Sequence, residues 1–278
     1  MRKVSVKDIT KAVRGLCISA ACDLEPDVVS AIRAAKAKEE SPLGAEVLGQ
    51  IVENFEIAAH EGLPMCQDTG ISVFFLEVGR QVELDGSLRD AVNEGVRQGY
   101  KDGYMRKSVC HPLKRTNTGD NTPAIIHTEI VEGDGIRIKI APKGAGSENM
   151  SRLKMLKPAE GVEGIKDFVV ETVTVAGGNP CPPIVVGVGV GGSFEKSAIL
   201  AKKALLRPLG TPNEDRDLSA LEAELLDRIN RLGIGPMGFG GTTTALAVHI
   251  EAYPCHIASL PVAVNIQCHA DRHKEVTI

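Results

Sequence analysis

The amino-acid sequence predicts an α/β protein, in which a mixed β-sheet is flanked by helices and preceded by a helical N-terminal region. Two observations lead to this fold class. The first sixty residues are rich in Ala and Glu and carry repeated helix-start signals. Beyond them, short apolar segments alternate with segments of helical periodicity, which is the pattern expected of strands and their flanking helices.

Three helices are expected in the N-terminal region. Ser5 can cap the first, Pro26 suits the first turn of the second, and Ser41 precedes the third. We expect residues 1–62 to be the helical part of a single domain that covers the whole chain, and residues 63–278 to be its α/β part.

The α/β part opens with an apolar run at residues 71–79, which predicts a buried strand, and the segment at 86–103 predicts the helix that follows. Residues 124–142 alternate apolar and polar side chains on both sides of a Gly-Asp-Gly turn at 133–135. This alternation predicts a β-hairpin, and the hairpin makes the sheet mixed.

The C-terminal half continues the same alternation and shows no internal repeat, no low-complexity run and no clear linker. One compact unit is therefore the simplest expectation. The expected helices cover 164–178, 193–206 and 218–232, and the expected strands cover 182–190, 245–253 and 256–266.

Composition excludes several classes of protein. An aromatic content of 3% and a formal net charge of -4 argue against nucleic-acid binding, which needs stacking surfaces and a basic face. The longest apolar stretch, at 182–192, is too short to cross a bilayer, and the first fifteen residues lack the apolar segment of a signal peptide. Seven cysteines without a secretion signal favour reduced thiols. We expect a cytoplasmic globular protein.

Three cysteines lie in turn-rich sequence: Cys66 in GLPMCQDTG, Cys181 in AGGNPCPPI and Cys268 in VNIQCHADRH. Gly and Pro allow a backbone to curl around a cluster and to aim amide N–H groups at its sulfur atoms. No CxxC spacing is present, so any metal site must be assembled from distant segments, and packed thiols remain the alternative.

The remaining cysteines have other expected roles. Cys17 and Cys22 fall on the first predicted helix among Leu, Ile and Ala, where a thiol fills space in the core. Cys110 and Cys255 each stand beside a histidine, so a zinc site built on them stays open as an alternative.

Polar residues beside the loop cysteines suggest a substrate pocket. Gln67 and Asp68 follow the first loop cysteine. An aspartate beside a metal site can act as an acid or base, and it can equally cap backbone N–H groups. Arg106 can bind a carboxylate or stay solvated. The residues that follow the third loop cysteine are His269, Asp271, Arg272 and His273.

Two glycine-rich strings could bind anions. GVGVGG at 187–192 follows a predicted strand and precedes a predicted helix, but no acidic residue follows at the dinucleotide spacing and GxxxxGK[ST] is absent. The nucleotide signal is therefore weak. KGAGSEN at 143–149 offers a run of backbone donors that suits a small carboxylate or a cluster sulfide.

Five motifs, taken in order, resemble the class I, iron-sulfur fumarate hydratases and the related tartrate dehydratase alpha subunits. The resemblance runs from about Pro64 to the C-terminus and is closest to the split form, in which a separate beta subunit supplies the C-terminal domain. The motifs are CQDTG, PKGAGSENMSRLKML, GGNPCPPIVVGVGVGG, GIGPMGFGGTTTALAVHIE and NIQCHADRH.

The resemblance implies a 4Fe-4S cluster bound by three cysteines, and the matching positions are Cys66, Cys181 and Cys268. In that family the fourth iron has no protein ligand, so it can accept substrate oxygens as a Lewis acid. The implied reaction is the reversible hydration of fumarate to L-malate. The implied partners are a beta subunit and a small dicarboxylate, in a hetero-oligomer.

The resemblance also implies the substrate contacts. Gln67 and Arg106 would bind the substrate, with Arg106 clamping a carboxylate, and Gly144 and Gly146 would add backbone contacts. The catalytic residues would be Asp68, for proton transfer directly or through a hydroxyl of the partner subunit, and His256, for bonding the substrate oxygens.

Three alternatives stay open. The alpha subunit of L-tartrate dehydratase shares CQDTG and CPP with this chain and performs the same kind of elimination, on a substrate with one more hydroxyl. A non-catalytic iron-sulfur carrier would use the same cysteines. A zinc hydrolase would use Cys110, Cys255 and nearby histidines.

Overall fold

The computed structural model describes all 278 residues, which divide into two compact units. Helices flank two mixed four-stranded sheets, and the predicted α/β class with a helical N-terminal region is confirmed. The expected helical part is shared between the units, and that the whole chain forms one domain stays a prediction. Unit 1 comprises Met1–Glu25, Asn54–Gly144 and Arg272–Ile278, and unit 2 comprises Pro26–Glu53 and Ala145–Asp271.

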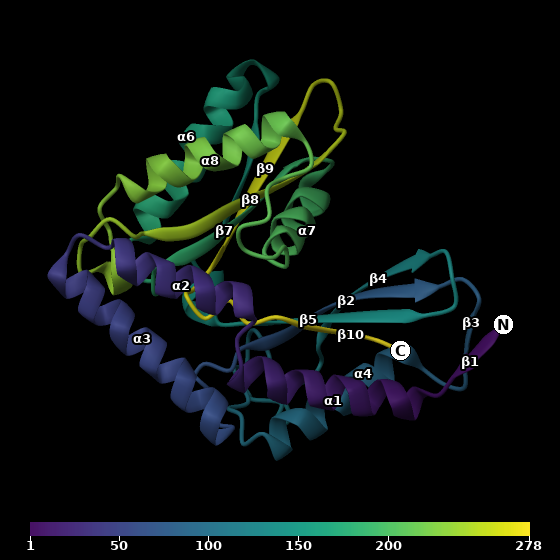
Figure 1. Cartoon of the computed structure of the whole chain (residues 1–278). Coiled ribbons are helices and arrows are strands. Elements are labelled where there is room, and N and C mark those ends of the chain that lie inside the picture. The colour runs from purple at the N-terminus through teal and green to yellow at the C-terminus, as the bar shows by residue number, and fades with distance from the viewer. The chain divides into compact units, whose positions relative to one another are not determined.

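Unit 1 is built around a sheet with the strand order β10-β5-β2-β4 (Figure 1). Strand β2 pairs parallel with β4 and antiparallel with β5, and β10 pairs antiparallel with β5. A short parallel pair, β1 with β3, lies apart from this sheet. The elements are β1 (Arg2–Val4), α1 (Val6–Cys22), β2 (Ile71–Gly79), β3 (Val82–Leu84), α4 (Leu88–Asp102), β4 (Ile125–Val131), β5 (Ile136–Lys143) and β10 (Lys274–Thr277).

The predicted hairpin between β4 and β5 is wrong, although both strands exist and run antiparallel. They lie on opposite sides of β2, and the loop between them crosses the end of that strand. Gly79 donates its N–H to the carbonyl of Gly135 at 2.8 Å, and an added Cβ at Gly79 would lie 2.5 Å from the Gly133 oxygen. Period-two alternation identifies strands but not their partners, and the more apolar β2 takes the central place.

The core of unit 1 lies between its sheet and helices α1 and α4 (Figure 1). Ser5 caps α1 as predicted, because its hydroxyl accepts the Lys7 N–H. Glycines on α4 let the two helices approach closely: an added Cβ at Gly99 would lie 2.7 Å from the Cys17 Cβ. Cys17 and Cys22 are buried here, which confirms their predicted core role, and burial raises the pKa of Cys17 to about 12.

Unit 2 is built around a sheet with the order β6-β9-β7-β8, in which β7 pairs parallel with β8 and antiparallel with β9. Helix α3 (Pro42–Glu61) begins in unit 2 and ends in unit 1. The other elements are α2 (Pro26–Lys38), α5 (Ala145–Glu148), β6 (Arg152–Leu156), η1 (Pro158–Glu160), α6 (Gly161–Ala176), β7 (Ile184–Gly191), α7 (Phe194–Ala204), α8 (Arg216–Asn230), η2 (Pro236–Gly238), β8 (Ala245–Tyr253) and β9 (Leu260–Gln267).

The glycine string at 187–192 has a packing role in unit 2. Helices α6 and α8 cover one face of the sheet and α7 covers the other (Figure 1). An added Cβ would lie 2.1 Å from the Ala201 carbonyl oxygen at Gly187, and 2.0 Å from the Ser197 oxygen at Gly189. These glycines lie inside β7 and allow the backbone of α7 to contact the strand, which accounts for the string without a nucleotide.

Three successive strands in each sheet share one arrangement that the sequence does not reveal as a repeat: β2, β4 and β5 in unit 1, and β7, β8 and β9 in unit 2. The first of the three lies in the middle, the second lies parallel beside it, and the third lies antiparallel on its other side. The fourth strand, beside the third, comes last in unit 1 (β10) and first in unit 2 (β6). The start of the first strand therefore meets the end of the third, Ile71 beside Lys143 in unit 1 and Val185 beside Gln267 in unit 2. We call this edge the cysteine end of each sheet. None of the helices is long and apolar enough to cross a membrane.

Candidate functional site

The cysteine end of unit 1 carries the CQDTG loop, which lies between α3 and β2. The thiol of Cys66 is half-buried, and the Asp68 N–H points to its sulfur at 3.4 Å. The same thiol lies 3.5 Å from Oε1 of Gln67, whose side chain is exposed. The Asp68 carboxylate accepts the Gly70 N–H at 3.1 Å through Oδ1. The loop thus places a thiol, an amide and a carboxylate together.

Buried hydrogen bonds hold this loop from behind. The Tyr100 hydroxyl donates to the carbonyls of Thr69 and Gly70, at 2.9 and 3.0 Å, and Asn121 Nδ2 also reaches the Gly70 carbonyl. Thr69 donates its hydroxyl to the Arg106 carbonyl at 2.8 Å. This last bond fixes the backbone of Arg106 beside the loop, while its side chain is exposed.

Gly144 follows β5 at the same end of unit 1 and lies against Asp68. An added Cβ at Gly144 would lie 3.1 Å from Oδ2 of Asp68 and 3.6 Å from Nη2 of Arg272. No positive φ requires this glycine, so the nearby side chains explain the missing Cβ. The structure therefore adds Arg272 to the predicted site residues. The sequence marked it only as a polar neighbour of Cys268, because its burial cannot be read from spacing.

The other two loop cysteines both lie at the cysteine end of unit 2. Cys181 precedes β7 with a φ of 57°, and Cys268 follows β9. The Cys181 carbonyl accepts the His269 N–H at 3.3 Å and lies 3.0 Å from His269 Nδ1, so the two loops are directly bonded. Gly146 belongs to this end as well, because its added Cβ would lie 3.5 Å from the Asn179 oxygen.

His256 lies elsewhere in unit 2. It belongs to the exposed loop between β8 and β9, next to Tyr253, which pairs with Gly191 at the end of β7. Its Nδ1 accepts the Ala258 N–H at 3.1 Å. Because Cys181 precedes the start of β7, the strand's whole length separates the two residues within the unit. The structure therefore does not bring His256 to the cysteine end of its own unit.

The cysteines proposed for zinc are in different units. Cys110, in unit 1, lies in an isolated bridge with Asn117, and the neighbouring His111 accepts backbone N–H groups through Nδ1. Cys255, in unit 2, donates to the Ser259 carbonyl at 3.2 Å. No group of three or more His, Cys, Asp or Glu side chains is placed to hold a metal ion.

The donor set suits a thiolate-bound iron-sulfur cluster. All three loop cysteines are unoxidised and half-buried, and all follow or precede a strand at the cysteine end of a sheet. The Asp68 amide aimed at Cys66 Sγ is a contact of the kind that stabilises cluster thiolates. The Cys268 thiol donates to the Ala270 carbonyl at 3.6 Å, a bond that deprotonation would release.

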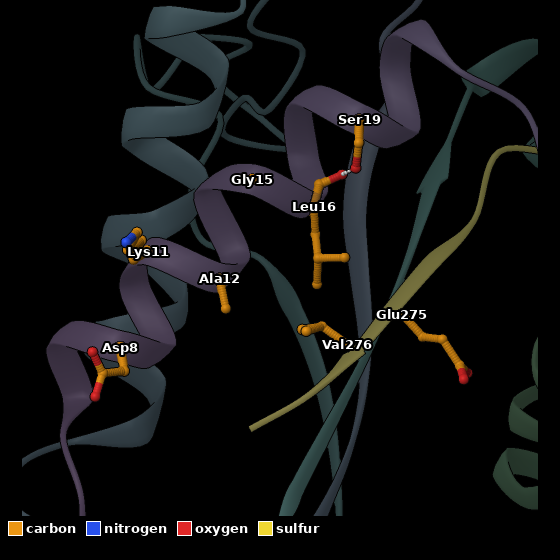
Figure 2. A pocket seen from close by; sticks show the side chains of 8 residues that line it. All are labelled: Asp8, Lys11, Ala12, Gly15, Leu16, Ser19, Glu275 and Val276. Atoms are coloured by element: carbon orange, nitrogen blue, oxygen red, sulfur yellow. Dashed lines mark hydrogen bonds between the residues drawn. The ribbon is translucent and has the colours of Figure 1, made fainter.

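An open groove also lies on unit 1, between α1 and β10 (Figure 2). Its lining on the helix includes the small residues Ala12 and Gly15 and the charged residues Asp8 and Lys11. None of the predicted site residues lines it. The complete lining is Asp8, Lys11, Ala12, Gly15, Leu16, Ser19, Glu275 and Val276.

Comparisons with known proteins cover nearly the whole chain. A family model described as Fumarate hydratase (Fumerase) matches residues 10–277. A Methanocaldococcus jannaschii protein, provisionally named L(+)-tartrate dehydratase subunit alpha, is 48% identical over 272 residues, which cover 95% of each chain. The L(+)-tartrate dehydratase subunit alpha of Escherichia coli K12 is 33% identical over 275 residues, covering 98% of this chain and 91% of the relative. Every candidate site residue lies inside the match to the family model.

Proposed function

The chain belongs to the fumarate hydratase family, and from this premise we propose that it is the alpha subunit of an iron-sulfur hydro-lyase that interconverts fumarate and L-malate. The observation that carries the proposal is the arrangement at the cysteine ends. Cys66 and Asp68 lie together in one unit, and Cys181 and Cys268 lie in hydrogen-bonded loops of the other.

Cys66, Cys181 and Cys268 would hold the cofactor together. A 4Fe-4S cluster, when bound, supplies an iron without a protein ligand as a Lewis acid for the substrate hydroxyl and carboxylate. The chain's own contribution is to supply three thiolates from loops that Gly and Pro shape, and to direct the Asp68 N–H at one sulfur.

Asp68 would move the substrate proton. Elimination of water from malate removes a proton from C3, turns the C3–H electron pair into the new double bond as the C2–O bond breaks, and releases hydroxide from C2, which takes up a proton to become water. The Gly70 N–H donates to Oδ1 of Asp68, and Oδ2 lies on the side of Gly144. Asp68 would accept the C3 proton directly, or would activate a hydroxyl of the beta subunit that does so.

The other predicted residues would bind and orient the dicarboxylate. The exposed guanidinium of Arg106 would clamp one carboxylate, because its backbone is fixed beside the CQDTG loop by Thr69. Gln67 would donate its amide from the same loop. Gly144 and Gly146 would offer backbone N–H groups, and neither carries a side chain that would obstruct the substrate.

His256 would act from a second copy of the chain. Within its own unit it lies at the end of the sheet opposite to Cys181 and Cys268, and its loop is exposed. We therefore propose an assembly that contains a beta subunit and at least two alpha subunits, in which the β8–β9 loop of one copy reaches the site of another.

L-tartrate is the second candidate substrate. The relatives at 48% and 33% identity bear the name of tartrate dehydratase alpha subunits, and this supports the alternative. Tartrate differs from malate by one hydroxyl, and a pocket discriminates strongly only when it hydrogen-bonds that group. The polar groups that would discriminate between malate and tartrate include those of the beta subunit.

The test is a reconstituted complex. The chain would be purified under argon alone and with its beta subunit, and kcat/KM would be measured for L-malate, fumarate and L-tartrate. We expect no turnover by the isolated chain and efficient turnover of malate and fumarate by the complex. A strong preference for tartrate would replace the fumarase assignment with the second candidate. Zinc without acid-labile sulfide, together with no elimination from either diacid, would overturn both.

A further inference from the structure

Arg272 is a buried charge whose role the proposed reaction leaves unexplained. Only 2% of the residue is exposed, and its Nε and Nη1 atoms have no hydrogen-bond partner. In unit 2, Arg207 also has a partnerless Nε, but its guanidinium donates to the buried carboxylate of Glu222 at 2.5 Å. Burying a guanidinium with donors unsatisfied costs free energy, so such a residue is retained where its charge serves a purpose.

Strand pairing places Arg272 at the cysteine end of unit 1. Strand β10 pairs antiparallel with β5, with Lys274 opposite Ile140. Arg272 precedes that pair by two residues, and it therefore lies alongside the end of β5, next to Gly144. Arg272 thus belongs to unit 1, although Cys268, four positions earlier in the chain, belongs to unit 2.

The charge of Arg272 acts on two groups, the Asp68 carboxylate in the CQDTG loop and the Tyr100 hydroxyl that supports this loop. The point at which Gly144 lacks a Cβ lies 3.6 Å from Nη2 of Arg272 and 3.1 Å from Oδ2 of Asp68. Burial raises the pKa of the Tyr100 hydroxyl well above its usual range, and the charge of Arg272 is among the effects that oppose this rise. Tyr100 in turn bonds Thr69 and Gly70, the residues that follow Asp68.

We propose that Arg272 is a positioning residue for Asp68, and that Gly144 is a glycine so that the attraction between the two side chains acts across an open gap. This inference rests on the proposed function, because it assigns Asp68 to proton transfer. The Gly70 N–H holds Oδ1, and the guanidinium draws Oδ2 toward Gly144. The charge of Arg272 thus adds to the Gly70 bond in orienting the carboxylate plane of Asp68.

The proposal explains two features of this part of unit 1. The unsatisfied donors of Arg272 leave its charge available to Asp68, whereas a guanidinium saturated by a closer carboxylate would be neutralised. A methyl at Gly144 would lie within 3.6 Å of both groups and would push Oδ2 from its place by a few tenths of an ångström. The charge of Arg272 and the absence of a side chain at Gly144 therefore act on the same carboxylate, that of Asp68.

The test uses the reconstituted alpha-beta complex with Arg272→Gln, Arg272→Lys and Gly144→Ala. Loss of orientation should slow proton removal, so we expect Arg272→Gln to lower kcat about 10-fold to 100-fold, with KM changed by less than about three-fold. The deuterium isotope effect on kcat, measured with substrate deuterated at C3, should rise. Arg272→Lys should recover part of kcat, and Gly144→Ala should raise the isotope effect with the charge intact. Arg137→Gln, which removes an exposed arginine paired with Glu275, should match the wild type.

A purely structural role predicts other results. It would lower kcat in proportion to the loss of folded, iron-loaded complex and would leave the isotope effect unchanged. A rise in KM alone would make Arg272 a substrate ligand, and either outcome overturns the proposal. If Arg272→Gln does not fold, unchanged isotope effects in Arg272→Lys and Gly144→Ala overturn it equally.

A structural readout separates this inference from the reaction itself. Failure of the wild-type complex to act on malate or tartrate would count against the proposed function alone. Crystal structures of the wild-type and Arg272→Gln complexes test the positioning directly. We expect the Asp68 side chain to leave its place against the Gly70 N–H and Gly144 in the variant, and an unchanged Asp68 rotamer contradicts the inference whatever the reaction proves to be.

Discussion

The two units share an arrangement of three strands but carry different residues at its cysteine end. In β2, β4 and β5 of unit 1, and in β7, β8 and β9 of unit 2, the first strand is central, with the second parallel on one side and the third antiparallel on the other. In unit 1 the cysteine end carries one thiol with a carboxylate, Cys66 with Asp68. In unit 2 it carries two thiols, Cys181 and Cys268, with the His269 imidazole against the Cys181 carbonyl. The comparison teaches that topology fixes where the loops gather, while the loop residues decide what each end does.

The units also place their glycines differently. In unit 1, Gly95 and Gly99 of α4 allow one helix to contact another, α1. In unit 2, Gly187 and Gly189 of β7 allow a strand to contact helix α7. Both arrangements remove side chains to shorten a distance, but only the second interrupts the apolar run of a central strand. This is the physical reason why a packing strand resembles a phosphate-binding loop in sequence.

The largest expected effect is loss of the proposed cluster, which a cysteine substitution in either unit should cause. Serine at Cys66, Cys181 or Cys268 should each reduce activity of the reconstituted complex to background and lower its iron content, because each thiolate is a predicted ligand. Cys110→Ser and Cys255→Ser are matched controls on loop cysteines beside histidines, and both should keep iron and activity. Anaerobic iron and sulfide analysis with an elimination assay checks this. Full iron and activity in any of the first three variants would remove that cysteine from the site.

The next effect separates the chemistry of unit 1 from that of unit 2. Asp68→Asn should lower kcat by about 10²-fold to 10⁴-fold, since it removes the proposed proton acceptor. Iron content should stay at the wild-type level, unlike in the cysteine variants. Asp134→Asn, at the opposite end of the same sheet, is the control and should leave kcat unchanged. Wild-type kcat in Asp68→Asn would transfer the acid-base role to the beta subunit.

Glycine substitutions sharpen the packing comparison. Gly189→Ala should destabilise the protein by about 3 kcal/mol or more, because its methyl would lie 2.0 Å from the Ser197 carbonyl oxygen and α7 must move. Gly15→Ala, on α1 with nothing within 4 Å of the added Cβ, should instead stabilise by about 0.5 to 1 kcal/mol. Urea unfolding followed by circular dichroism measures both. Equal stability of the two variants would contradict the role assigned to the strand glycines.

The smallest effect is a pH dependence that belongs to unit 2. Burial, with Arg207 nearby, lowers the pKa of His249 to about 4. The unfolded chain takes up this proton first as pH falls, so the stability that neutral His249 allows is present above about pH 6.5 and declines toward about pH 4. Between pH 7 and pH 5 the wild type should lose about 2 kcal/mol more than His249→Gln. Parallel urea titrations test this, and identical pH dependence in both proteins would show that His249 is solvated.

Much of the fold follows from local signals in the sequence. Ser5 and Pro26 mark helix starts correctly, because a cap and a fixed φ act on their own segment. The strands at 71–79 and 245–253 coincide with β2 and β8, because alternation or a continuous apolar run reflects burial. The pairing of β4 and β5 was not predictable in this way, since partner choice depends on the third strand that lies between them.

Only those residues of the candidate site that lie in recognisable loops could be predicted from the sequence. Cys66, Asp68, Cys181 and Cys268 lie in loops rich in Gly and Pro, which the sequence identifies directly. The role of Arg272 depends on β10 returning beside β5, a contact between segments more than a hundred residues apart. His256 shows the converse: its motif matches the family, but its place at the far end of β7 appears only in three dimensions.

The central claim is that thiolates from both units serve one cluster that binds the substrate. Mössbauer spectroscopy of the ⁵⁷Fe-loaded alpha-beta complex, with and without malate or tartrate, tests it most directly. We predict that the signal of one iron in four changes when substrate is added, and that the Cys66→Ser, Cys181→Ser and Cys268→Ser complexes lack the cluster signal. Four irons that ignore both diacids, or a full cluster in any of the three variants, would contradict the account.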